Sequence, residues 1–77
     1  MTFLQIMTFR TGDLGAAMQI HDQWRRATEG KRTLRREILA RDRDNPGSYV
    51  VLAYFDSYES AAQNSQLPET QHAAEQF

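Results

Sequence analysis

The apolar run from Tyr49 to Phe55 constrains the fold most, because it is the longest uninterrupted apolar stretch of the chain. It is rich in β-branched and aromatic residues, which fit a pleated, buried surface. A run without polar alternation predicts a strand that is covered on both faces. Asp56 ends the run, and Glu59 follows at the spacing of a capping box. We therefore expect a buried strand, then a helix that is capped by Asp56 and extends after it to about Asn64.

A second two-sided strand is predicted over residues 2–9. Both of its faces are mostly apolar, and one layer of helices can cover only one face of a sheet. The other face then needs a partner, and a chain of 77 residues gains stability by oligomerising. We expect a homodimer that packs sheet on sheet. The two faces of this strand carry Phe3, Gln5, Met7 and Phe9 on one side and Leu4, Ile6 and Thr8 on the other.

A long helix is predicted between these strands. A turn at residues 11–13 starts it, it extends from about Leu14 to Glu29, and Gly30 suits the position after its end. At 100° per residue its apolar side chains form one continuous arc. His21 and Trp24 both lie within that arc, so we expect both to face the sheet.

The next segment predicts a strand from Leu34 to Asp42 near a sheet edge, because polar and apolar residues largely alternate along it. A turn at residues 44–47, with Pro before Gly, joins it to the apolar run as an antiparallel hairpin. After the interruption at Leu67 and Pro68, a second helical piece is expected over Glu69 to Phe77.

The order of elements is therefore β-α-β-β-α, and the whole of residues 1–77 is one domain. This is a ferredoxin-like α+β fold without its last strand, which would pair beside the first. Either the chain continues beyond the given residues, or a partner covers the open edge of the first strand.

Composition excludes several classes of function. The net charge is −1, which argues against a nucleic-acid or membrane-surface binder. No stretch approaches a membrane span or a secretory signal, so a cytoplasmic protein is expected. There is no cysteine and there are two histidines, so no structural zinc site is expected. Eight of the nine basic residues lie at positions 25–43, and none follows. Residues 44–77 form an acidic segment, with five acidic side chains and no basic one. The basic residues are expected to form either an edge that meets this acidic segment or a rim that attracts an anionic ligand.

The pattern of elements and the segment SYVVLAYFDSYESAAQNSQLPE, residues 48–69, resemble the dimeric α+β barrel superfamily, within it the antibiotic-biosynthesis-monooxygenase-like domains. The resemblance implies a homodimer whose two sheets form a barrel, with a pocket between sheet and helices in each protomer. Members include enzymes that oxidise polyaromatic compounds without metal or flavin, and others that degrade heme.

The same resemblance bears on individual residues. His72 falls on the catalytic histidine position of the heme-degrading branch, whereas Ala62 and Met7 stand where that branch has Trp and Asn. Heme degradation is therefore not expected, nor is any metal, heme or flavin. Asn64 stands where the plain monooxygenase-like pattern commonly has His, and this departure argues against an oxygenase. Asn64 is nevertheless a candidate ligand-binding residue.

The candidate catalytic residues are His21 and His72, and the candidate ligand-binding residues are Trp24, Tyr54 and Asn64. Each has a structural alternative, since a histidine or tryptophan on an apolar helix face commonly fills core. Two function classes stay open: an enzyme that acts without cofactor on a small apolar or aromatic molecule, and a non-catalytic dimeric module that binds a ligand or a protein. A cavity that touches His21, Trp24 and a tyrosine would favour the enzyme.

Overall fold

The computed structural model of the chain describes residues 1–76 and has the predicted ferredoxin-like α+β order. One antiparallel sheet of three strands packs against three helices. The predicted C-terminal helical piece is present, and its last residue, Phe77, lies outside the described residues. The elements are β1 (Phe3–Arg10), α1 (Leu14–Ala27), β2 (Arg36–Arg41), β3 (Ser48–Phe55), α2 (Tyr58–Gln66) and α3 (Pro68–Glu75).

The apolar run forms the central strand of the sheet, whose order is β1-β3-β2. Both neighbours are antiparallel to β3: Leu4 and Arg36 stand on either side of Tyr54, and Ile6 and Ile38 on either side of Leu52. Within the described residues no strand pairs with the outer edge of β1.

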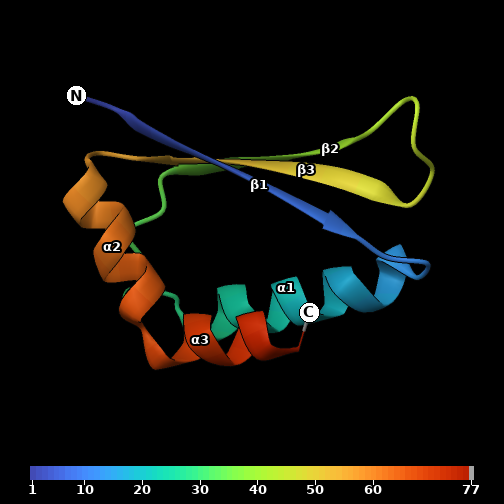
Figure 1. Cartoon of the computed structure of the whole chain (residues 1–77). Coiled ribbons are helices and arrows are strands. Elements are labelled where there is room, and N and C mark those ends of the chain that lie inside the picture. Colours follow the sequence, from blue (N-terminus) through green and yellow to red (C-terminus); the bar gives the residue numbers. More distant parts are fainter. Residues whose placement is uncertain (77) are drawn as a thin grey trace.

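All three helices lie on one face of the sheet (Figure 1). Helices α1 and α3 run side by side below the strands, and α2 descends to them from the end of β3. No described element covers the opposite face, although apolar side chains occupy it. Leu4 and Ile6 on that face are 41% and 62% exposed. The predicted two-sided apolar character of β1 is therefore confirmed.

The compact part of the core lies where α2 meets the sheet. Ala53 and Phe55 of β3 pack with Ala61 of α2, and Phe3 and Leu34 pack against this cluster. Two of the three central residues are alanines, so α2 approaches the sheet closely at this end. Core side chains do not fill the space between α1 and the sheet, and the cavity described below lies there.

The start of α2 differs from the prediction. The N-cap is Ser57, whose hydroxyl accepts a hydrogen bond from the backbone N–H of Ser60 at 3.1 Å. Asp56 instead pairs with the Arg35 guanidinium at 2.6 Å. This ion pair holds the pKa of Asp56 below its usual value, mainly through the hydrogen bond from Arg35. Asp56 therefore does not cap α2, because its carboxylate is engaged across the sheet.

Helix α1 starts as predicted and ends earlier. Asp13 caps it by accepting from the backbone N–H of Ala16 at 3.0 Å. At the other end Thr28, which is fully buried, donates its hydroxyl hydrogen to the carbonyl of Trp24 at 2.7 Å. The helix therefore closes at Ala27, two residues before the predicted end.

The basic and acidic segments of the chain meet within one protomer. Arg35 pairs with Asp56, and Lys31 pairs with Glu69 at 2.6 Å. The Lys31 ammonium lowers the pKa of Glu69 through its hydrogen bond. These two pairs tie the segment before β2 to the residues at the start of α2 and at the start of α3.

Candidate functional site

A cavity of about 510 Å³ lies between α1 and the helix-covered face of the sheet. Met7 and Leu39 border it, and they stay 41% and 39% exposed although helices cover their side of the sheet. These apolar side chains are exposed because an open cavity lies in front of them. The cavity is bordered by residues from all three strands, from α1, and from the junction of α2 and α3.

The floor of the cavity consists of rows of side chains across the three strands. One row is Met7, Val51 and Leu39, which is wholly apolar. The adjacent row is Gln5, Ala53 and Glu37, in which two polar side chains flank a small one. The floor therefore has an apolar part beside a polar row.

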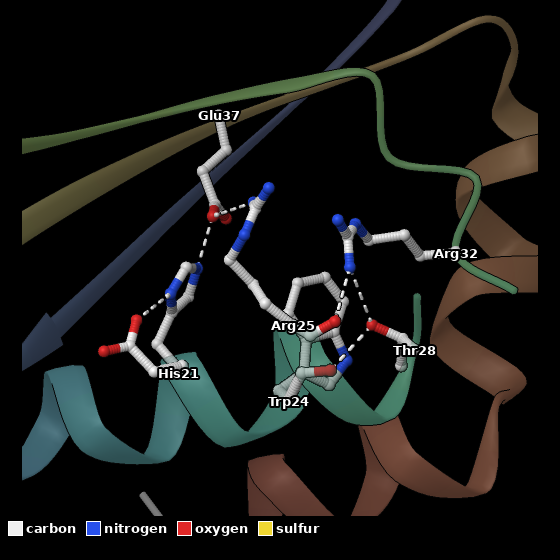
Figure 2. A network of polar contacts seen from close by, with 7 residues as sticks. His21, Trp24, Arg25, Thr28, Arg32 and Glu37 are labelled. Atoms are coloured by element: carbon white, nitrogen blue, oxygen red, sulfur yellow. Dashed lines mark hydrogen bonds and ion pairs between the residues drawn. The ribbon is translucent and has the colours of Figure 1, made fainter. Parts of the chain in front are cut away.

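His21 of α1 and Glu37 of β2 meet at the wall of the cavity (Figure 2). His21 Nε2 contacts Glu37 Oε1, and Arg25 Nη1 lies 3.5 Å from the same oxygen. Burial alone would raise the pKa of Glu37, but the hydrogen bond and charge of His21, with the charge of Arg25, lower it overall. Glu37 is therefore an ionised carboxylate at neutral pH.

The other ring nitrogen of His21 has no hydrogen-bond partner within residues 1–76, although it is buried. Its nearest charged group is the Asp22 carboxylate at 3.9 Å. The ring thus lies between two carboxylates, with Glu37 in contact and Asp22 further away.

Trp24 forms a fixed wall of the cavity. Its Nε1–H donates to Thr70 Oγ1 of α3 at 2.9 Å, and its ring centre lies 5.8 Å from that of His21. The Arg32 guanidinium lies 5.8 Å from the centre of the Trp24 ring, and it donates to the Arg25 carbonyl at 2.7 Å. Figure 2 shows Arg32 and Trp24 beside Thr28 at the end of α1.

Asn64 borders the cavity from α2 and is 7% exposed. Its Oδ1 accepts a hydrogen bond from the backbone N–H of Thr33 at 3.2 Å. This bond fixes the orientation of the amide, because only the oxygen end can accept. The NH₂ group of the amide, Nδ2, then remains as a hydrogen-bond donor for other groups.

The structure brings together three of the five candidate residues of the sequence analysis: His21, Trp24 and Asn64 all border the cavity. Tyr54 does not border it, because strand alternation places it on the opposite face of the sheet, where Arg36 lies 5.8 Å from its ring centre. The expectation that a tyrosine reaches this cavity is wrong for the described residues.

His72 is separate from this group. It is exposed and borders a shallower groove of about 320 Å³ between α1 and α3. Trp24 borders both the groove and the cavity. His21 and His72 are therefore not parts of one cluster in this structure.

Glu37 is the site residue that the sequence analysis missed. The alternation of the second strand suggested an apolar face with Ile38 and Ala40. The register instead turns Glu37 and Leu39 toward the helices. Leu39 could have indicated that Glu37 faces the helices. It is the apolar residue that breaks strict alternation, and it lies on the same strand face as Glu37.

Among residues 1–76, no three His, Cys, Asp or Glu side chains gather where they could hold a metal ion. None of the described helices is long and apolar enough to cross a membrane.

Comparison with solved structures defines the fold. The chain is similar to one described as "Putative antibiotic biosynthesis monooxygenase from Nitrosomonas europaea", with a TM-score of 0.75 and 12% sequence identity. The match covers 96% of this chain and 73% of that one. The chain therefore shares the fold of that structure, an α+β domain with a ferredoxin-like order of elements. No family model and no curated protein matches the sequence.

Proposed function

We propose that this protein binds a small apolar or aromatic molecule in the cavity under α1 and acts on it as a monooxygenase-like enzyme without a cofactor. One observation carries the proposal: an acid–base pair, His21 and Glu37, lies in the wall of a largely apolar cavity. Such a combination is the usual character of a site for a small molecule.

The walls suit a flat apolar ligand. Trp24 and Phe9 offer aromatic surface, and Met7 and Met18 offer side chains that adapt to different shapes. The fold shared with a structure described as a putative antibiotic biosynthesis monooxygenase supports the same class of reaction.

This reaction requires the protein mainly to transfer a proton and to exclude water. When oxygen reacts without a cofactor, the substrate must supply the electrons, and it does so more readily as an anion. The protein's task is then to remove a proton from the bound molecule. The His21–Glu37 pair would take that proton as a unit, with the carboxylate stabilising the charged ring.

A simple ketone, 2-tetralone, tests this role, because both its ring and its carbonyl activate the C1 protons. In D₂O the protein should accelerate deuterium exchange at C1, followed by NMR, and it should promote oxygen uptake in metal-free buffer. Glu37→Gln and His21→Gln should each slow the exchange by about 10²-fold or more. Glu59→Gln, an exposed change on α2, is the matched control. Exchange no faster than in buffer would contradict the enzymatic role.

We further propose that the protein acts as a cytoplasmic homodimer. The open face of the sheet supports this, since Leu4 and Ile6 are exposed there and the strand register adds Ile38 and Leu52 to the same face. Apolar sheet faces are stable when a second layer covers them. The partner sheet would leave the cavity untouched, because the cavity lies on the other side.

A further inference from the structure

We infer that the cavity contains a polar subsite over Ala53, where the side-chain amides of Gln5 and Asn64 hydrogen-bond a neutral carbonyl oxygen of the ligand. The inference rests on the proposed binding role of the cavity and specifies the ligand chemistry. It uses two residues that the acid–base role does not require.

The position of the subsite follows from the strand register. Gln5 and Glu37 stand opposite Ala53 on its two sides, so the row has an alanine at its centre. Ala53 packs with Ala61 of α2, and Asn64 lies three residues after Ala61, on the same side of the helix. Asn64 therefore reaches the cavity next to this row.

Asn64 supplies a hydrogen-bond donor of fixed direction. Its Oδ1 is held by the Thr33 N–H at 3.2 Å, and its Nδ2 makes no hydrogen bond within residues 1–76. The one buried side-chain polar atom without a partner among these residues is His21 Nδ1, so Asn64 Nδ2 is accessible. Because the residue is only 7% exposed, the cavity that it borders provides this access.

Gln5 supplies the second amide. It borders the cavity from β1, and its side chain makes no hydrogen bond within the described residues. Unlike Asn64 it has no partner that fixes its orientation, so it can turn its NH₂ group toward an acceptor. Two amide donors in the wall of one cavity suit a carbonyl oxygen, because it has two lone pairs and can accept two hydrogen bonds.

Charge disfavours a ligand that is already an anion when it binds. The third member of the row is Glu37, whose pKa is held below its usual value and which is ionised at neutral pH. A ligand carboxylate over Ala53 would meet this like charge in a partly buried setting, which is costly. A ketone or quinone oxygen accepts the two hydrogen bonds without that cost.

The experiment compares 2-tetralone with tetralin, which has the same ring system and no carbonyl. Binding is followed through the fluorescence of Trp24, the only tryptophan of the chain, which borders the cavity. Gln5→Met keeps the length of the side chain and removes its donor. Asn64→Asp keeps the oxygen for Thr33 and replaces the Nδ2 donor. Gln63→Met, on the exposed side of α2, is the matched control.

Each variant should raise the Kd for 2-tetralone by about fivefold, the factor that one hydrogen bond contributes, and leave the Kd for tetralin within about twofold. Gln63→Met should change neither. Thermal unfolding followed by circular dichroism checks that each variant folds. If Asn64→Asp does not fold, Gln5→Met decides the question alone.

Two other results of the binding experiment would distinguish a failure of the subsite from a failure of the proposed function. If Gln5→Met changes the affinity for both probes equally, or for neither, the subsite is overturned while the cavity remains a binding site. If neither probe alters the fluorescence of the wild-type protein, the proposed function fails, and the subsite falls with it.

Discussion

Glu37 gives the cavity its acid–base character, because it contacts the His21 ring from β2. Its side chain is 16% exposed, and a carboxylate so placed needs positive partners to stay ionised. His21 and Arg25 are those partners. At the scale of single residues, the site thus depends on the Glu37 carboxylate, which His21 and Arg25 keep ionised.

This pairing predicts a pH dependence of stability. Because the pKa of Glu37 is lowered in the folded protein, its contribution is complete above the ordinary glutamate value of about 4.3. It is lost as the pH falls below that value through the folded-state pKa. Urea unfolding at pH 6 and pH 3 should show a smaller loss of stability for Glu37→Gln than for wild type. Equal losses in the two proteins would contradict the pairing.

The sequence predicted which apolar helix face carries His21 and Trp24, and the structure places both at the cavity. It could not predict the role of Glu37 or the outward position of Tyr54. Both depend on strand register, since a shift by one residue exchanges the two faces of a strand. In a strand that is apolar on both faces, such as β3, composition does not distinguish them.

At the scale of elements, α2 shows why local signals can be ambiguous. Asp56 and Ser57 are both good N-cap residues, and the sequence spacing favoured Asp56. The Arg35 guanidinium, which is 21 residues away in the chain, engages Asp56 and leaves the cap to Ser57. A contact of that sequence separation lies outside any local pattern.

The cap assignment gives a prediction. Ser57→Ala should lower the free energy of unfolding by about 1 kcal/mol, because an N–H at the start of α2 loses its acceptor. Asp56→Asn should have a much smaller effect, since its ion pair is exposed. Chemical denaturation of both variants measures this. The reverse order of effects would restore Asp56 as the cap.

The hydrogen bond from Trp24 to Thr70 gives another prediction, because it joins α1 to α3. Thr70→Val keeps the shape of the side chain and leaves the indole N–H without its acceptor. The free energy of unfolding should fall by about 1–3 kcal/mol. Thr2→Val, at the exposed N-terminus, is the control. An unchanged stability of Thr70→Val would show that the bond does not hold α3.

At the scale of the whole molecule, the order of elements and the central place of the apolar run were predictable from the sequence. The positions of all six elements follow from periodicity and turn residues such as Pro46 and Gly47, and Gly47 has the positive φ of 84° that its turn requires. The cavity was not predictable, because its volume depends on how far α1 stands from the sheet rather than on any local pattern.

The open sheet face predicts self-association. Light scattering should give the mass of a dimer at micromolar concentration. Ile6→Glu places a charge at the most exposed apolar position of β1, 62% exposed, and should shift the protein to monomers because a buried unpaired charge is costly. Arg10→Glu, at the end of the strand, is a charge control. A monomer mass for the wild-type protein would contradict the dimer.

The central claim is that the cavity under α1 binds a small aromatic molecule, and NMR mapping with 2-tetralone tests it most directly. We predict saturable shifts of the Trp24 indole N–H and of backbone amides of β1 and β3 around Met7 and Val51, all beside the cavity. Amides around His72, in the groove between α1 and α3, should not move. Shifts confined to the His72 groove, or no saturable shifts at all, would contradict the account.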